Sequence, residues 1–110
     1  MTVDVCLLTE LPPGSMRLVA VGELEIGVYN CADGVLRAIE DRCSHDDGPL
    51  CEGDWDPVDC VVVCPRHGSR FDLATGRPLS LPAFEPVAVY EVTVEGGVVR
   101  LDVGDALAPS

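Results

Sequence analysis

Short apolar runs rich in Val, Ile and Leu recur along the chain, and each is about as long as a β-strand. They cover residues 17–21, 24–30, 35–40, 58–64, 87–94 and 98–103. Turn-forming residues separate them, including the Asp33-Gly34 pair and the Glu95-Gly96-Gly97 triplet, which closes the last two runs into a hairpin. No segment shows a sustained helical period. The pattern therefore predicts an all-β fold, a small antiparallel β-barrel or sandwich.

The composition changes between Glu40 and Val87, where two loop-rich segments flank a single apolar run. Residues 41–57 read DRCSHDDGPLCEGDWDP and residues 64–86 read CPRHGSRFDLATGRPLSLPAFEP, both dense in Gly, Pro and Asp. Long loops inside a small domain usually carry function. We therefore look for the chemistry of the protein in these two segments.

The charge of the chain narrows the class of partner. Nineteen acidic residues against seven basic ones give a net charge of −12, which repels nucleic acid and anionic lipid and favours a protein or small-molecule partner. With 110 residues we expect one domain, and no apolar run is long enough for a membrane helix. The first ten residues lack the features of an export signal. We expect a soluble, cytoplasmic monomer.

Both histidines of the sequence lie in these loop-rich segments, and each is paired with a cysteine. The pairs are Cys43-Ser44-His45 and Cys64-Pro65-Arg66-His67, with eighteen residues between them. Two thiolates and two imidazoles suit either a tetrahedral zinc ion or an iron–sulfur cluster. Each loop here mixes one Cys with one His, which favours a two-iron cluster with two cysteines on one iron and two histidines on the other.

This spacing, C-x-H and then C-x-x-H, resembles the Rieske [2Fe–2S] motif. The stretches PLCEGDW (49–55) and HGSRFDLATGRPLSLPA (67–83) and the closing hairpin are similar to small bacterial Rieske-type ferredoxins, so the likeness covers nearly the whole chain. It implies a Rieske fold in a single domain over residues 1–110, with a cluster-binding subdomain at about 41–83 inserted in a basal β domain.

The resemblance also implies the role of each motif residue. Cys43 and Cys64 would hold the inner iron of one [2Fe–2S] cluster, and His45 and His67 the outer iron near the surface. Leu81-Pro82-Ala83 is similar to the proline loop that covers the cluster.

Departures from the wider family indicate the type of carrier. The high-potential Rieske proteins of cytochrome bc complexes have a disulfide between the ligand loops, but this sequence has Gly48 and Arg66 at those positions. Their loop serine is kept as Ser69, whereas their tyrosine is replaced by Phe71, so one hydroxyl donor to a sulfur is missing. Fewer such hydrogen bonds lower the potential, and we expect a low-potential carrier at about −150 mV.

Four further cysteines fall outside the motif. Cys6, Cys31 and Cys60 lie in or beside strand patterns and are interpreted as small buried apolar residues. Cys51 lies nearer the cluster loops, and a Cys51–Cys60 disulfide is the alternative. The single tryptophan, Trp55, is expected to pack in the domain rather than to line a partner surface.

No histidine is left over for acid–base catalysis, so the protein is expected not to be an enzyme itself. The resemblance implies a one-electron carrier between a flavin-dependent reductase and a terminal oxygenase or another iron enzyme. A role beside iron–sulfur cluster assembly systems stays open. So does permanent binding as a small subunit of a larger reductase such as a nitrite reductase, and so does a zinc-stabilised binding module.

Overall fold

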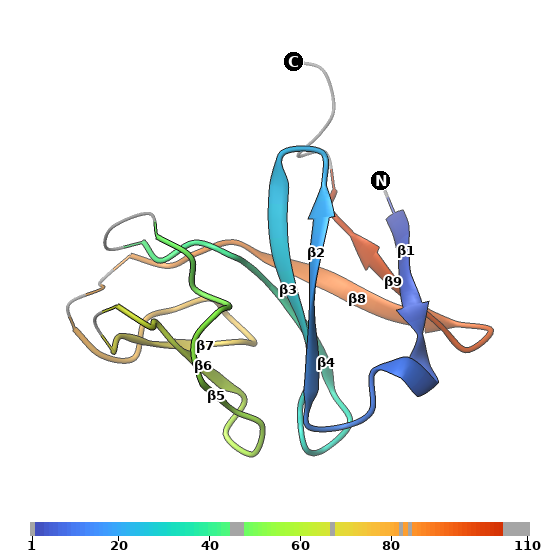
Figure 1. Cartoon of the computed structure of the whole chain (residues 1–110), viewed down its shortest axis with the longest axis horizontal. Helices are drawn as coiled ribbons and strands as arrows, with labels where there is room; N and C mark the ends of the chain where they lie inside the picture. The colour runs from blue at the N-terminus through green and yellow to red at the C-terminus, as the bar shows by residue number, and fades with distance from the viewer. Residues whose placement is uncertain (1, 45–47, 67, 82, 84, 105–110) are drawn as a thin grey trace.

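The computed structural model describes residues 2–44, 48–66, 68–81, 83 and 85–104. These residues form nine β-strands and one 3₁₀ turn, η1 (Leu8–Glu10), in two antiparallel sheets (Figure 1). The larger sheet has the order β1-β9-β8-β4-β3-β2 and the smaller one the order β5-β6-β7. The larger contains β1 (Thr2–Leu7), β2 (Ser15–Val21), β3 (Leu24–Asn30), β4 (Leu36–Glu40), β8 (Val89–Glu95) and β9 (Val98–Asp102). The smaller contains β5 (Trp55–Asp56), β6 (Val61–Val63) and β7 (Arg70–Asp72). The all-β prediction is confirmed.

Five of the six predicted strands form within about two residues of their expected ends, as β2, β3, β4, β8 and β9. The run predicted at 58–64 was too long, because only β6 is extended. Residues 58 and 59 lie in a turn held by the Asp56 carboxylate, which accepts the N–H groups of Val58 and Asp59 at 2.9 and 3.2 Å. Cys60 then has φ of 57°, a left-handed conformation that breaks the strand.

The sequence patterns missed β1, β5 and β7. β5 and β7 have two and three residues, too few to show an alternation. β1 forms because it pairs with β9 at the other end of the chain, with Thr2 opposite Asp102. Its existence depends on a distant partner rather than on a local signal.

Strand β3 is buried on both faces. Ile26 and Val28 pack into a core inside the larger sheet, whereas Tyr29 faces a second core shared with the smaller sheet. The adjacent residues Ala38 and Ile39 of β4 divide in the same way. Because alternate residues of a strand point to opposite faces, β3 and β4 act as a wall between the two cores.

The smaller sheet lies in a long insertion between β4 and β8, and Figure 1 shows the chain leaving the larger sheet and returning to it. The insertion begins and ends at neighbouring points. Ala38 of β4 pairs with Tyr90 of β8, and the Glu40 N–H donates to the Ala88 carbonyl at 2.9 Å. The insertion therefore forms a second body beside the larger sheet, packed on the outer face of β3 and β4.

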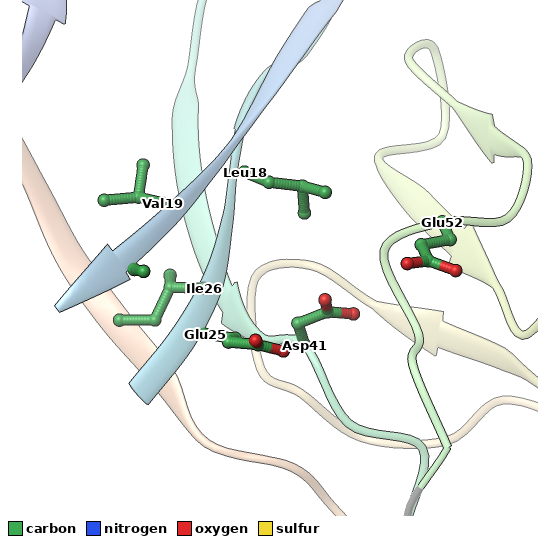
Figure 2. A pocket seen from close by; sticks show the side chains of 7 residues that line it. Leu18, Val19, Glu25, Ile26, Asp41 and Glu52 are labelled. Carbon is green, nitrogen blue, oxygen red and sulfur yellow. The ribbon is translucent and has the colours of Figure 1, made fainter. Parts of the chain in front are cut away.

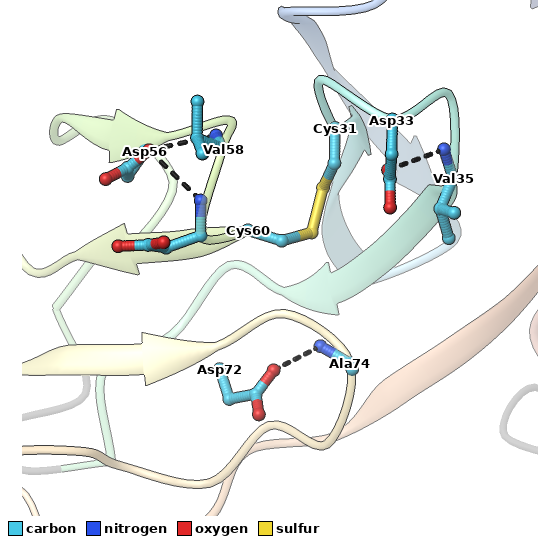
Figure 3. Close-up of a disulfide and its surroundings, with 9 residues drawn as sticks. Cys31, Asp33, Val35, Asp56, Val58, Cys60, Asp72 and Ala74 are labelled. Atoms are coloured by element: carbon cyan, nitrogen blue, oxygen red, sulfur yellow. Dashed lines mark hydrogen bonds between the residues drawn. A yellow bond between two sulfur atoms is a disulfide. The ribbon is translucent and has the colours of Figure 1, made fainter.

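A disulfide joins Cys31, directly after β3, to Cys60, directly before β6 (Figure 3). This corrects two expectations, because Cys31 and Cys60 are not separate apolar residues and Cys60 does not pair with Cys51. Their Cα atoms are 5.6 Å apart although 29 residues separate them in sequence. The Ala32 N–H donates to the Pro57 carbonyl at 2.8 Å beside the crosslink. Cys51 remains a buried thiol, and Cys6 is partly exposed.

Within the described part of the chain, no helix has the length and apolar character that crossing a membrane requires.

Gly27 of β3 is predicted to be intolerant of a side chain. A Cβ atom there would lie 2.5 Å from the Cys51 sulfur and 2.8 Å from a ring carbon of Tyr29. We expect Gly27→Ala to lower the free energy of unfolding by about 1–3 kcal/mol, the usual cost of overpacking. The measurement is the urea midpoint followed by Trp55 fluorescence.

Cys51→Ala supplies the control, since it removes the nearer clashing atom. In a double-mutant cycle the cost of Gly27→Ala should be smaller in the Cys51→Ala background. Strictly additive costs would show that the two residues do not constrain each other.

Candidate metal centre

The first ligand loop begins where β4 ends. The Cys43 N–H donates to the Gly48 carbonyl at 2.8 Å. Asp41 joins the start of this segment to its end, because its Oδ1 accepts the N–H groups of Leu50 and Cys51 at 2.8 and 2.7 Å. The loop is thereby fixed on both sides of Cys43.

The second ligand loop follows β6 without a spacer. The Cys64 N–H donates to the Ser69 carbonyl at 2.8 Å, and the Gly68 N–H donates back to the Cys64 carbonyl at 3.0 Å. Gly68 has φ of 75°, which favours glycine at that position. In both loops the cysteine N–H bonds to the carbonyl five residues ahead. Two different sequences thus make the same closure.

The two cysteines share one buried environment. Cys43 and Cys64 are 0% and 1% exposed, neither forms a disulfide, and both belong to the core cluster that contains Phe71 and Leu73. The backbone at Gly53 lies close against Val63, the residue before Cys64, because a Cβ at Gly53 would clash with the Val63 carbonyl oxygen. The structure therefore brings together both predicted thiol ligands, each at the base of a tight loop.

The predicted ligands His45 and His67 and the predicted loop residue Pro82 lie outside the described residues. Among the residues that are described, no group of three or more His, Cys, Asp or Glu side chains could hold a metal ion. The two buried thiols are the described residues that bear on the fit to a [2Fe–2S] cluster. Two buried thiols from two loops suit one iron of such a cluster. The sequence of each loop also contains one histidine, which could bind the other iron. The donor set fits the group.

Two further predicted residues, Ser69 and Phe71, are completely buried. The Ser69 Oγ accepts the Ala83 N–H at 3.1 Å, so the hydroxyl hydrogen remains able to donate elsewhere. Phe71 pairs with Val62 across β6 and β7, and as a phenylalanine it offers no hydroxyl. Leu81, which precedes Pro82, is 79% exposed, whereas Ala83 is buried.

Sequence reasoning missed a buried polar group beside the first loop. The Tyr29 ring is fully buried, and Trp55 packs edge-on against it with centroids 4.8 Å apart, which confirms that Trp55 packs in the domain. The Tyr29 hydroxyl interacts with the Cys51 thiol but makes no well-formed hydrogen bond with a described atom. Burial raises the pKa of Tyr29 well above its usual value, and the nearby Cys51 and Asp41 raise it further.

Burial likewise raises the pKa of the Cys51 thiol to about 12, while the Tyr29 hydroxyl opposes this shift and Asp41 adds to it. Asp41 had no sequence signal beyond its place two residues before Cys43 in a chain rich in acids. Its contacts span the whole first loop and could be recognised only from the structure.

A pocket of about 230 Å³ opens on the outer side of this loop (Figure 2). Leu18, Val19 and Ile26 of the β2–β3 hairpin line one part of it, and the carboxylates of Asp41 and Glu52 come from the insertion. Neither ligand cysteine lines it. It is a surface depression at the junction of the two bodies rather than the metal centre.

Comparison with known proteins agrees with this geometry. A family model described as the Rieske [2Fe-2S] domain matches residues 1–91. The chain is 37% identical over 101 residues to the 3-phenylpropionate/cinnamic acid dioxygenase ferredoxin subunit of Escherichia coli (strain K12), which covers 92% of each chain.

Solved structures resemble it closely. The ferredoxin of carbazole 1,9a-dioxygenase from Nocardioides aromaticivorans IC177 superposes with a TM-score of 0.83 at 34% identity, covering 91% of this chain and 95% of the other. A chain from a complex of reduced oxygenase and oxidized ferredoxin in carbazole 1,9a-dioxygenase superposes with a TM-score of 0.81 at 39% identity, covering 91% of each.

Cys51 is predicted to resist alkylation in the folded protein. Only the thiolate reacts, and raising the pKa from 9.0 to about 12 lowers the thiolate fraction at pH 8 by about a thousandfold. After iodoacetamide treatment at pH 8, peptide mass spectrometry should find Cys6, which is partly exposed, labelled long before Cys51. Equal labelling rates would contradict the buried environment described here.

Proposed function

The chain belongs to the Rieske [2Fe–2S] family and is a ferredoxin-type electron carrier, and from this premise we propose that Cys43, His45, Cys64 and His67 hold its cluster. The cysteines take the inner iron and the histidines the outer one. When bound, the cluster supplies one-electron transfer. The observation that carries the assignment is the pair of matched loop closures that buries both thiols in one core.

The described neighbours of His67 support an outward position for the outer iron. Pro65, Arg66 and Gly68 are exposed, whereas Cys64 at the start of the same loop is buried. The second loop therefore passes from a buried cysteine to exposed residues on both sides of its histidine. We propose that electrons leave at this exposed part of the second loop, and we assign residues 41–83 as the cluster-binding subdomain within a single domain of 1–110.

The partners we propose are a flavin-dependent reductase as electron donor and a terminal oxygenase as acceptor. Two relatives are named as ferredoxins of dioxygenases, and one solved relative is a complex of oxygenase and ferredoxin. The net charge of −12 would steer such a carrier toward basic patches on its partners. We propose that it works as a cytoplasmic monomer that moves between them.

Permanent binding as a subunit of a larger reductase is less well supported. The exposed large apolar residues of the described chain are spread over several elements, for example Leu18 on β2, Val58 before β6 and Leu81 near the second loop. A permanent interface would need a large continuous apolar patch.

The ligand assignment is tested by substitution. Cys43→Ser or Cys64→Ser should abolish the red-brown colour and the two iron and two sulfide per chain, because the inner iron needs both thiolates. Cys6→Ser is the control, since Cys6 lies in β1 far from both loops in sequence, and it should keep the full cluster spectrum. A colourless wild-type protein with one zinc per chain would overturn the proposed function.

We propose that the potential is low, because Phe71 offers no hydroxyl, and that the buried Ser69 hydroxyl, whose oxygen accepts the Ala83 N–H, donates its hydrogen toward the cluster. Ser69→Ala should lower the potential further, by tens of millivolts, where about 59 mV equals a tenfold change in a one-electron equilibrium. The reason is that a hydroxyl donor stabilises the more negative reduced state. Protein-film voltammetry gives the measurement.

Ser80→Ala is the matched control for this test. The Ser80 Oγ also accepts a backbone N–H, from Arg70 at 2.9 Å, but its side chain is partly exposed and belongs to neither ligand loop. The potential of the Ser80→Ala variant should equal that of the wild type. An equal shift in both variants would show that Ser69 acts only on the fold.

A further inference from the structure

The Cys31–Cys60 disulfide attaches the strand that leads into Cys64 to the larger sheet (Figure 3). Cys31 continues directly from β3, and Cys60 leads directly into β6. β6 has only three residues and ends immediately before Cys64. Three residues of extended chain therefore separate the crosslink from a proposed iron ligand.

Few other bonds hold this end of the smaller sheet. In the described part of the chain, β6 pairs only with β5 and β7, and no strand of the smaller sheet pairs with one of the larger sheet. The hydrogen bond from Ala32 to Pro57 and the packing of the shared core accompany the disulfide. The crosslink is the covalent part of an attachment that otherwise consists of backbone hydrogen bonds and side-chain packing.

The two cysteines of the disulfide differ in exposure. Cys31 is 1% exposed, whereas Cys60 is partly exposed and follows a turn in which Val58 is 80% exposed. Cys60 is therefore the half of the bond that lies nearer to an incoming thiol. Asp56 and Asp59 flank that side, and their charge repels an anionic thiol such as glutathione more than a neutral dithiol.

We propose that this disulfide is a redox-sensitive attachment for the second ligand loop, opened at Cys60 by a dithiol reductant and re-formed by the reverse exchange, in which the two cysteine thiols reduce an oxidised dithiol. The inference rests on the proposed function, because it takes Cys64 as a cluster ligand. With the bond open, β6 is held by packing and hydrogen bonds alone, so the loop that carries Cys64 opens more often. The oxidised form should retain its cluster longer than the dithiol-reduced form.

The exchange balances within the two reactants. A thiolate of the dithiol attacks the Cys60 sulfur, the bond between Cys60 and Cys31 breaks, and Cys31 leaves as a thiolate that takes up a proton. The second thiol of the reductant then attacks its own partner sulfur in the mixed disulfide and releases Cys60 as a thiol. Two electrons pass from the dithiol, which becomes a disulfide, to the pair of cysteines.

The first experiment counts thiols. Wild-type protein purified without reductant is denatured in the presence of an alkylating reagent, and its intact mass is measured. Four modified cysteines are expected, namely the four outside the disulfide, Cys6, Cys43, Cys51 and Cys64. Six modified cysteines would overturn the inference.

The second experiment measures cluster release to an iron chelator, followed by the loss of visible absorbance. The Cys31→Ser/Cys60→Ser variant should release iron at least about fivefold faster than the wild type, and the control Cys6→Ser should release it at the wild-type rate. Equal rates in all three proteins would overturn the redox attachment while leaving the proposed function intact. A wild-type protein that never binds a cluster would overturn the proposed function instead.

A third measurement needs no substitution and holds even if the double variant fails to fold. The folded wild type is treated with neutral dithiothreitol or with glutathione at equal thiol concentration, and mass and absorbance are followed together. The dithiol should open the bond faster than glutathione does, and opening should precede cluster loss. A bond that opens only after the absorbance has gone would overturn the inference.

Discussion

The burial of β3 on both faces is the constraint on which the other features depend. A strand covered on only one side would leave Tyr29 in water, and the smaller sheet would have no apolar surface on which to pack. Because β3 is covered on both sides, one core stabilises the larger sheet and the other stabilises the insertion. The cysteines of both ligand loops lie in the second core, so the geometry of the site follows from how well that core packs.

The two loops share one backbone hydrogen bond, from the cysteine N–H to the carbonyl five residues ahead, in unrelated local sequences. The first uses Gly48 as acceptor and is strengthened by the Asp41 carboxylate, whereas the second uses Ser69 and a left-handed Gly68. In each case the cysteine N–H is satisfied inside its own loop. Each cysteine is therefore held by a backbone hydrogen bond of its own loop in addition to the core packing around its side chain.

The parts of this architecture that depend on local patterns could be predicted, and those that depend on distant partners could not. The apolar run that forms β3 and the Glu95-Gly96-Gly97 turn are local signals, and the Cys and His spacing resembles a known cofactor motif. The pairing of Thr2 with Asp102 and the bond between Cys31 and Cys60 arise only when the larger sheet closes and the insertion folds back on it. The role of Asp41 could not be predicted for another reason. In a sequence with nineteen acidic residues, nothing distinguishes an acid that binds loop N–H groups from one on the surface.

The neighbouring ends of the insertion have a consequence for how such proteins diversify. The chain leaves at Glu40 and returns at Ala88, where a backbone hydrogen bond of 2.9 Å already joins the two points. In the topology of the larger sheet, the whole insertion thus takes the place of a hairpin connection between β4 and β8. The insertion can therefore change in length without altering the strand order of the larger sheet. What ties it to that sheet is the apolar outer face of β3 and β4 together with the Cys31–Cys60 disulfide, rather than the path of the chain.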